Sequence, residues 1–402
     1  MARIDFTERY YIDSYARELE ATVLSCEETG DGNYHLTFDE TIFYPEGGGQ
    51  PGDRGQVERL ESSERVDILD TQYDTENRIV HLATGPLSVG ERVQLRIDWE
   101  RRYEFMQQHS AEHLVSGLIK QRYGFENVGF HINEELTTLD TSGELPEGAI
   151  AWLTEAMNEV VWGDLPFETT VHPAADVAEL DYRSKIDLPY DVRLVRVEGV
   201  DLCACAGTHV HQTGELGQVR FIDHHKHRGG TRLTMLAGSR ALRDAERLQA
   251  QALRMGARLA APRLELEPAL DKLDEQMEAL VEENRRLTAR LFGLVFPGQL
   301  EKPTVAIIPE GLSGKDIKYQ MKGLELAEGG KVLFLQAGQT GVKFFLRCTT
   351  KEEQQEVMAY LKEAHGAKGG GPPQLSQGAL ASTDVEAVQA DFAEQGWARV
   401  EV

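Results

Sequence analysis

Apolar and polar residues alternate in short runs along the first quarter of the chain, and turns containing Gly or Asp separate the runs. Such alternation is typical of a half-buried β-strand, and several of these strands at close spacing predict a small β-barrel. We therefore expect a short leading helix followed by a barrel within residues 1–100. The expected strands are residues 19–26, 34–38, 65–69, 80–82 and 92–97.

The next stretch changes to a helical period. Met106, Val115, Leu118 and Ile119 recur near every 3.6 residues, which predicts a helix that Gly124 ends. Beyond it the pattern predicts antiparallel strands and a second helix, so that residues 101–240 form an α+β unit. The elements expected there are a hairpin of residues 129–133 and 136–140, a helix over 146–161, and strands near 167–172 and 192–197.

Residues 241–298 predict a helical segment that Pro262 and Pro268 interrupt. Its second part carries apolar residues spaced alternately three and four apart, which is a coiled-coil seam. Asn284 lies in this seam, where a buried polar group often fixes the register and a dimeric state. The seam predicts a homodimer, or an antiparallel hairpin with the preceding helix. Its residues are Leu270, Leu273, Met277, Leu280, Asn284, Leu287, Leu291 and Leu294.

Residues 299–402 predict a separate α/β domain, because apolar strands alternate with helices. The loop of residues 369–378 has a glycine triplet but no Walker-type lysine or Rossmann glycine spacing, so we do not expect a nucleotide phosphate site. The chain is thus predicted to be an α+β multidomain protein: a small N-terminal β-barrel, a two-layer α/β unit, a helical coiled-coil linker and a C-terminal α/β domain. The C-terminal strands are expected at 305–308, 332–335 and 342–346, and the helices at 315–327, 351–365 and 384–395.

Charge and composition narrow the class of function. A formal net charge of −25 argues against indiscriminate nucleic-acid binding, which needs Lys and Arg to neutralise phosphates. Residues 218–234 are nevertheless locally basic. The side chains expected near an RNA backbone are Lys226, Arg228 and Arg232. Three histidines of this stretch have two interpretations: they are further metal ligands, or they form a solvated or phosphate-facing edge. They are His224, His225 and His227.

The sequence also bounds the compartment. No apolar run approaches the roughly 20 residues that a membrane span needs, and the first residues lack the apolar core of a secretory signal. Four scattered cysteines give no disulfide framework. We therefore expect a cytoplasmic protein without a membrane partner.

Two pairs of side chains have the spacing of metal ligands. His109 and His113 lie at i and i+4 of the predicted helix and should share one face, although such a pair alone is often surface decoration. Cys205 and His209 repeat the spacing within a Gly-Thr turn. A divalent ion such as zinc accepts nitrogen and thiolate ligands together, and iron or cobalt is not distinguished by the sequence. Cys203 lies two residues before Cys205 and complicates the choice of the cysteine ligand.

A glycine-rich segment interrupts the predicted barrel at residues 41–53. Its triplet, Gly47, Gly48 and Gly49, cannot form a comfortable strand interior, because glycine loses the most backbone entropy and has no side chain to pack. Such a run is either a flexible loop or a backbone that a ligand approaches closely. The polar neighbours favour the second interpretation; they are Thr41, Gln50 and Asp53.

These motifs, taken in order, resemble a known family. The segments 43–51, 109–113 and 205–209 look like those of the AlaX trans-editing proteins and of the editing domain of alanyl-tRNA synthetase, over roughly residues 1–240. The coiled coil and the loop of residues 369–378 resemble the C-terminal domain of that synthetase. The sequence reads Cys-Ala-Gly-Thr-His where the family commonly has Cys-Gly-Gly-Thr-His, a change small enough to keep the ligand assignment.

The resemblance implies hydrolysis of serine or glycine from mischarged tRNA(Ala). The barrel begins almost at Met1, so we expect a free-standing deacylase rather than a ligase. Zinc ligands would be His109, His113 and Cys205, with His209 as a fourth ligand or a nearby base. The resemblance also implies that Thr41 and the glycine triplet line the amino-acid pocket, with Thr41 sensing a serine hydroxyl. Weaker candidates are Gln108 and Asp140, the latter as an orienter of a liganding histidine.

Two other functions fit the same residues. One is a zinc-bearing tRNA-binding protein without turnover. The other is a deacylase of a different aminoacyl-tRNA or small ester. The domains expected on the leading hypothesis are a barrel with the glycine-rich motif (1–100), a zinc-binding editing domain (101–240), a coiled-coil segment (241–298) and a synthetase-like C-terminal domain (299–402).

Overall fold

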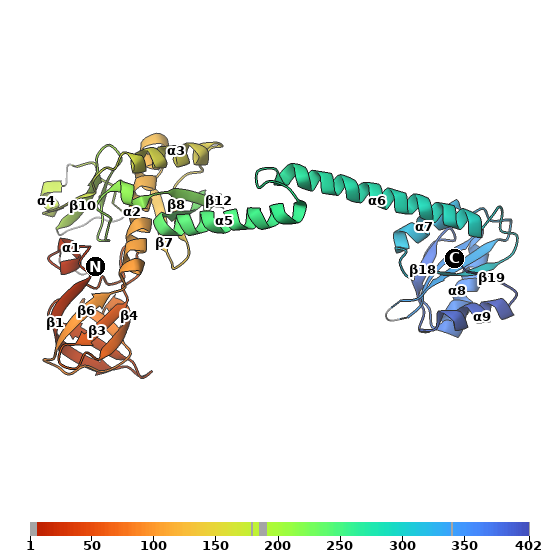
Figure 1. Cartoon of the computed structure of the whole chain (residues 1–402), viewed down its shortest axis with the longest axis horizontal. Helices are drawn as coiled ribbons and strands as arrows, with labels where there is room; N and C mark the ends of the chain where they lie inside the picture. Colours follow the sequence, from red (N-terminus) through yellow and green to blue (C-terminus); the bar gives the residue numbers. More distant parts are fainter. Residues whose placement is uncertain (1–5, 178–179, 185–190, 339–340, 402) are drawn as a thin grey trace. The chain divides into compact units, whose positions relative to one another are not determined.

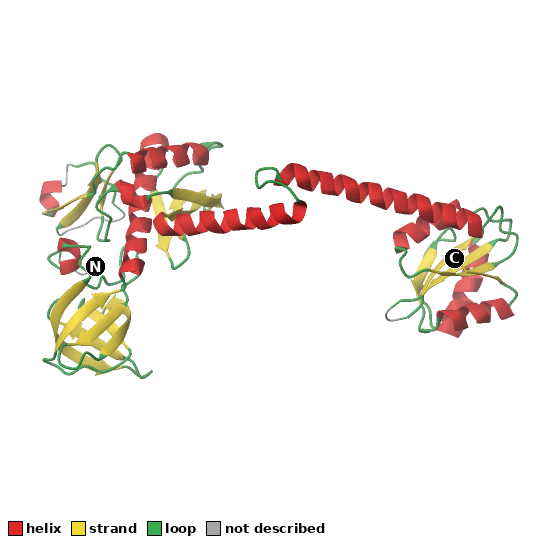
Figure 2. Cartoon of the chain, in the orientation of Figure 1, coloured by secondary structure: helices red, strands yellow, loops and turns green. Residues whose placement is uncertain are grey.

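The computed structural model describes residues 6–177, 180–184, 191–338 and 341–401. The chain divides into two compact units, Met1–Ala252 and Leu253–Val402 (Figure 1). Each unit mixes helices and sheets (Figure 2). Among the described residues, no helix is both long enough and apolar enough to cross a membrane.

A closed β-barrel forms the start of the first unit, as the alternating pattern predicts. Its six antiparallel strands follow the order β1-β2-β5-β4-β3-β6 around the barrel. Alternate side chains such as Leu36, Val57 and Leu95 fill the interior and are fully buried. A four-residue helix, α1 (Arg9–Ile12), precedes the barrel. The strands are β1 (Glu18–Glu28), β2 (Tyr34–Phe38), β3 (Gly55–Arg59), β4 (Arg65–Tyr73), β5 (Ile79–Ala83) and β6 (Arg92–Ile97).

The sequence did not predict strand β3. Its five residues contain one apolar side chain, Val57, so there is no alternation to recognise. The strand is fixed instead by its neighbours, because it pairs with β4 on one side and with β6 on the other. Pairing across the sheet therefore overrides a weak local pattern.

Helix α2 (Trp99–Tyr123) is the central element of the rest of this unit. Asp98 caps its start by accepting a hydrogen bond from Arg101 N at 3.1 Å, and Gly124 ends it, as expected. Most of its side chains are buried, and they lie on all faces of the helix, because α2 packs against two sheets and helix α3 (Ala149–Trp162). Such all-round burial explains why polar side chains on this helix find partners inside the protein.

Two antiparallel sheets surround α2, which confirms the α+β character of this unit. One has the order β12-β13-β8-β7 and the other the order β11-β10-β9. The expected hairpin pairs Phe130 with Leu139. The strands are β7 (Asn127–Ile132), β8 (Thr137–Thr141), β9 (Glu168–His172), β10 (Val192–Val197), β11 (Asp201–Ala204), β12 (Val219–His227) and β13 (Gly230–Ala237), with the short helices α4 (Ala174–Val177) and η1 (Thr213–Leu216).

Two long helices follow, α5 (Gly238–Leu259) and α6 (Leu266–Val295). Pro262 lies between them, as predicted. Pro268 does not interrupt the helix, and that expectation is wrong: it is the third residue of α6. Proline is tolerated in a first helical turn because the N–H groups there have no partner within the helix.

The second unit is an α/β domain built on one six-stranded sheet, ordered β17-β18-β16-β15-β14-β19. Side chains of one face, such as Leu333, pack on α8 and α9, while those of the other face, such as Phe334, pack on α7 and the end of α6. The three last strands were not predicted. The elements are β14 (Thr304–Ile308), α7 (Gly314–Gly323), β15 (Lys331–Gln336), β16 (Lys343–Cys348), α8 (Lys351–His365), β17 (Lys368–Gly370), β18 (Ser376–Ala379), α9 (Val385–Glu394) and β19 (Ala398–Glu401).

A buried histidine makes the stability of the first unit depend on pH. Burial lowers the pKa of His81 to about 4 from its usual 6.5, so the folded protein keeps this ring neutral where the unfolded chain binds a proton. Stability is therefore lost as pH falls from about 6.5 to about 4. We expect wild type to lose on the order of 3 kcal/mol more unfolding free energy than His81→Gln between pH 7 and 4. Denaturant titrations in chelator measure this difference, and parallel pH dependences would contradict it.

Candidate metal centre

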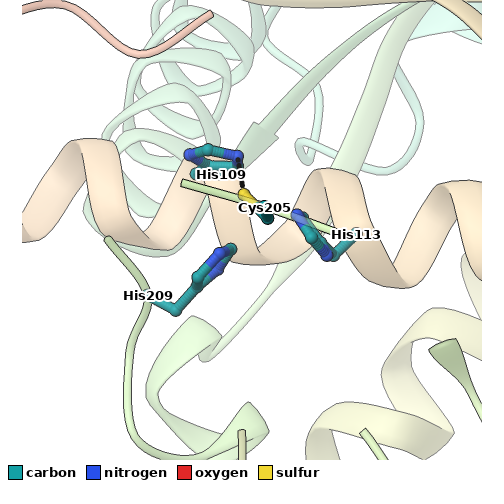
Figure 3. A group of neighbouring side chains, drawn as sticks. All are labelled: His109, His113, Cys205 and His209. Atoms are coloured by element: carbon teal, nitrogen blue, oxygen red, sulfur yellow. Dashed lines mark hydrogen bonds between the residues drawn. The ribbon is translucent and has the colours of Figure 1, made fainter. Parts of the chain in front are cut away.

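Four side chains from two distant segments converge inside the first unit. His109 and His113 come from α2, and Cys205 and His209 come from the loop that follows β11 (Figure 3). One ligand atom from each lies within 4.8 Å of the others. The three histidines are buried and the cysteine is half-buried. The sequence predicted all four, and this set of nitrogen and sulfur atoms is able to hold a divalent metal ion.

His113 is oriented by a carboxylate. Its Nδ1 lies 3.1 Å from Asp201 Oδ2, and a carboxylate only accepts, so Nδ1–H donates and Nε2 is the nitrogen left for the cluster. Arg183 holds Asp201 in turn through two hydrogen bonds of 2.6 and 2.7 Å. A charged chain of this kind fixes both the tautomer and the orientation of a liganding ring.

His109 is oriented by the glycine-rich segment. Its Nδ1 lies 3.0 Å from Gln50 Oε1, while Gln50 Nε2 donates to Thr208 Oγ1 at 2.8 Å. The amide oxygen therefore accepts from the ring, and His109 Nε2 points to Cys205 Sγ at 3.4 Å. The Gly47–Gln50 turn closes through two backbone hydrogen bonds. It is a tight turn against the cluster, which favours the ligand-approach interpretation over a flexible loop.

His209 carries the clearest sign of a missing partner. Its Nδ1 lies 3.2 Å from Ser110 Oγ. Its Nε2 is buried and has no hydrogen-bond partner among the described residues. An unsatisfied buried nitrogen costs free energy unless another group binds it. The residues present therefore fit a metal ion or another ligand at this position.

Gly207 permits the close approach of the loop to α2. A Cβ at this position would lie 2.0 Å from His109 Cε1, so any side chain would push the two segments apart. The difference from the usual family motif falls one residue earlier, at Ala206. The glycine that the packing requires is thus kept, and the alanine does not disturb the ligand loop.

Electrostatics favour a metal-binding form for Cys205 and His209 but the protonated form for His113. Burial would raise the pKa of the Cys205 thiol, but His109 and His113 outweigh burial and hold that pKa well below its usual value. Burial would lower the pKa of His113, whereas Cys205 and Asp201 raise it to about 10. Burial, followed by the charge of His113, lowers the pKa of His209 to about 3. The cluster therefore holds a thiolate, a neutral His209 and a protonated His113, which would release its Nε2 proton when a metal binds.

Cys203 lies in a second, adjoining group with His113 and Asp201. Burial raises the pKa of the Cys203 thiol well above its usual value, although Arg183 opposes the rise. Arg183 also occupies both oxygens of Asp201. A cation would meet that guanidinium and a protonated thiol, so this second group is the poorer metal site.

Thr41 lies in the barrel rather than among the four cluster residues. Its hydroxyl is 2.9 Å from His81 Nε2 and accepts from Phe43 N at 3.0 Å. His81 Nδ1–H donates to Leu36 O at 3.1 Å, so Nε2 of the neutral ring accepts the Thr41 proton. Thr41 thus keeps one oxygen lone pair, and it lines a cavity of about 250 Å³ with residues such as Tyr73 and Arg78.

Gln108 and Asp140, the two weaker candidates, bind residues outside the cluster. Gln108 holds strand β13, since its amide accepts from Ala237 N and donates to Ala237 O, both at 2.9 Å. Asp140 does not orient a histidine of the cluster: both of its oxygens bind Arg232 at 2.6 Å. The carboxylate that does so is Asp201, and the expectation for Asp140 is therefore corrected.

The basic stretch forms the β12–β13 hairpin. Lys226 is 81% exposed and pairs with Glu144 at 2.6 Å, and Arg228 is exposed at the turn. Arg232 is partly covered by its pair with Asp140. His224 and His225 are exposed on β12, outside the metal-capable groups found among the described residues.

Two residues near the cluster, Asp201 and Glu112, were not among the sequence candidates, and a third, Gln50, was named only as a polar neighbour of the glycine triplet. Gln50 directly follows the glycine triplet, and its position was a usable signal. Asp201 has no signal of its own, because its contact with His113 arises from packing. Glu112 lies between the two histidines of α2 in the sequence. Its side chain is buried and accepts a hydrogen bond from Ser116 Oγ at 2.6 Å. Burial would raise its pKa, but His113 and Arg183 lower it, so it adds a negative charge beside the cluster.

Comparisons with known proteins agree with this architecture. Residues 15–101 match the family "tRNA synthetases class II (A)", and residues 192–234 match "Threonyl and Alanyl tRNA synthetase second additional domain". The rat alanyl-tRNA editing protein Aarsd1 is 32% identical over 58% of this chain and 60% of its own length. The AlaX-L editing protein of Pyrococcus horikoshii is 31% identical over 54% of each chain.

The two family matches make this chain a relative of the tRNA synthetases and their additional domains. Alanyl-tRNA editing protein Aarsd1-B of Xenopus laevis is 30% identical over 68% of this chain and 69% of its own length. The chain belongs to the family of alanyl-tRNA editing proteins. It spans 54 to 60% of the rat and archaeal relatives that it matches.

Replacing Cys205 and Cys203 one at a time tests which of the two cysteines is a metal ligand. We expect wild type to bind one zinc ion per chain and Cys205→Ser to lose more than the ~100-fold in affinity typical of a lost orienting partner. Cys203→Ser should keep its zinc, because its thiol is protonated and set apart from the four converging atoms. Elemental analysis and chelator competition measure both. Equal losses in the two variants would contradict the assignment.

Proposed function

We propose that this protein is a trans-editing hydrolase that removes serine, and also glycine, from mischarged tRNA(Ala) at a zinc site. The observation that carries the proposal is the convergence of four ligand atoms within 4.8 Å in a buried site. The names of the relatives supply the substrate class. We further propose that it acts in the cytoplasm.

An aminoacyl ester is already activated, so positioning and electrostatic stabilisation suffice for its hydrolysis. A bound zinc ion would polarise the ester carbonyl and lower the pKa of water. We assign His109, His113 and Cys205 as ligands. His209, neutral and with an unpartnered Nε2, is then a fourth ligand or a nearby base that accepts a hydrogen bond from the attacking water.

The residues around the ligands hold them ready for the reaction. Gln50 and Asp201 each accept from the Nδ1–H of one ligand, so that both rings present Nε2 without rearrangement. Three protein ligands would leave a coordination position for water or substrate, whereas four would close a tetrahedral site. We favour three, because an editing site must admit an ester.

We propose that Thr41 and the turn at Gly47, Gly48 and Gly49 line the amino-acid pocket. The Thr41 hydroxyl donates to His81 and accepts from Phe43, so its remaining lone pair can accept only from a substrate donor such as the serine hydroxyl. Alanine lacks that donor and gains nothing there. Glycine would be admitted because it lacks a side chain.

For the tRNA we propose contacts from Lys226, Arg228 and Arg232. The pair of Lys226 with Glu144 is exposed, and exposed ion pairs contribute little free energy. A phosphate could therefore replace Glu144 at small cost. Arg232 exchanges its partner less readily, since its two bonds to Asp140 are short and parallel.

Matched histidine variants test the activity. His109→Ala should lower kcat/KM for Ser-tRNA(Ala) by ~100-fold or more, because several kcal/mol of stabilisation of the transition state are lost with the metal. His131→Ala, on the exposed side of β7, should leave the rate unchanged. Release of labelled serine measures both. Intact ester with zinc-replete wild type would contradict the proposal; retained tRNA would then indicate a binding protein, and hydrolysis of another charged tRNA a different specificity.

We also propose a homodimer through α6. Every apolar residue of the predicted seam remains 41 to 79% exposed, which is unusual for so many leucines on one helix face. The other side of the helix is used: Thr288 and Phe292 are buried, Phe292 in the core of the second unit. A second copy of this chain would cover the exposed seam by knobs-into-holes packing.

A charge placed in the seam should separate the copies. Leu280 is 70% exposed in the chain, so Leu280→Glu should leave each copy folded while opposing burial in a dimer. Ala279→Glu adds the same charge one residue away, outside the seam, and should remain dimeric. Sedimentation equilibrium measures the masses. A monomeric wild type would refute the dimer.

A further inference from the structure

Three consecutive carbonyl groups of the ligand loop are bound by two side chains. Arg193 Nη1 donates to Cys205 O and to Gly207 O, both at 2.9 Å. Tyr11 OH donates to the carbonyl between them, Ala206 O, at 3.0 Å. The two donors come from different places, strand β10 and helix α1, and they meet on one side of the loop.

This binding determines which way the peptide groups face. With the carbonyl oxygens held by Arg193 and Tyr11, the N–H of Gly207 points to Cys205 Sγ at 3.2 Å. An N–H group aimed at a thiolate stabilises its charge and holds its position. The segment continues no strand beyond β11, so hydrogen bonds from its surroundings fix its shape. Around Cys205 these are the contacts just described and the Cys205 N–H bond to Arg193 O at 3.0 Å, and further along Gln50 Nε2 donates to Thr208 Oγ1 at 2.8 Å.

The residues after Tyr11 extend the same contact to the second ligand of the loop. Ser14 Oγ donates to His209 O at 3.3 Å, and His211 N donates to Tyr15 OH at 3.2 Å, with the two rings stacked at 3.9 Å. The N-terminal segment therefore follows the ligand loop from Ala206 to His211. Tyr11 and Ser14 precede residue 15, where the first family match begins.

Burying Arg193 costs more free energy than a purely structural role would require. This residue is only 6% exposed. Its Nε has no hydrogen-bond partner within the described part of the chain. Burying a cation costs more than burying a neutral donor, so a neutral side chain would bind two carbonyls at lower cost. The guanidinium also lies against the ring of the other donor, with its Cζ 5.2 Å from the centroid of Tyr11, so the two residues hold one another beside the loop.

We propose that Tyr11 and Arg193 are positioning residues of the metal centre: by binding three successive carbonyls they hold Cys205 and its loop in the shape that receives the metal. Neither touches a ligand atom, so both act through the loop. The inference rests on the proposed zinc site, and its test requires no tRNA.

Conservative pairs of variants isolate the effect. Tyr11→Phe removes the hydroxyl that binds Ala206 O, and Tyr10→Phe removes the neighbouring hydroxyl, which bonds Tyr73 instead. Arg193→Met removes the buried donor, and Arg196→Met removes an exposed arginine of the same strand that pairs with Glu168. Zinc affinity is measured by chelator competition, the cobalt-substituted absorption spectrum reports the thiolate, and the metal-free unfolding midpoint reports the fold.

We expect Tyr11→Phe to weaken zinc ~10-fold and Arg193→Met ~100-fold, with an altered thiolate-to-cobalt band, while both control variants match wild type. Equal zinc affinity for Tyr11→Phe and Tyr10→Phe would overturn the proposal. So would losses of zinc that merely follow the metal-free unfolding midpoint. The Tyr11 comparison decides if Arg193→Met fails to fold. Tight zinc binding without any deacylation would refute the proposed function and leave this inference standing.

Discussion

A buried ion pair joins the parts that make the site. Arg102, on α2, is fully buried and donates to both oxygens of Asp53, which follows the glycine turn. The same guanidinium donates to Ile42 O at 2.7 Å and to Ser14 O at 3.1 Å. Desolvation makes such a pair a poor source of net stability, but removing one partner typically costs 3–5 kcal/mol because the other charge is left buried. Its contribution is therefore geometric.

The geometry of the cluster follows from that connection. The glycine turn is held against α2, which places Gln50 on His109. The N-terminal segment is held through Ser14, which places Tyr11 on the loop of Cys205. Gly117 of α2 lets the turn between β10 and β11 approach the helix closely, because a Cβ at this position would lie 2.3 Å from Val200 O. The rings of His109 and His113 thus each meet a fixed acceptor, which sets their orientation before any metal binds.

The sequence predicts those parts of the structure that depend on local pattern. Alternation gives most barrel strands, and helix α8 has the expected bounds, residues 351–365. The spacing of two i, i+4 pairs identifies four converging side chains. Position in the sequence does not reveal contacts made by packing. Asp140 and Asp201 both lie in strands, and only the approach of α2 to the β10–β11 turn selects Asp201 for His113.

The same limit applies to the other corrections. Strand β3 contains a single apolar residue, and β17 contains none, so both are fixed by pairing with neighbours rather than by their own pattern. The expectation that Thr41 senses substrate stays a prediction, and its hydroxyl bonds His81, forty residues later in the chain. That bond narrows its role to an acceptor. A local motif thus singled out Thr41, while its tertiary partner determines which hydrogen bond the hydroxyl can still make.

The central claim is that one metal ion, held by side chains from two distant segments, is required to hydrolyse mischarged tRNA(Ala). Titrating the metal-free protein with zinc while following hydrolysis of Ser-tRNA(Ala) tests it most directly. The account predicts a rate near background without metal, a linear rise, and a plateau at one zinc ion per chain. A full rate in the metal-free protein, or no activity at any zinc level, would contradict it.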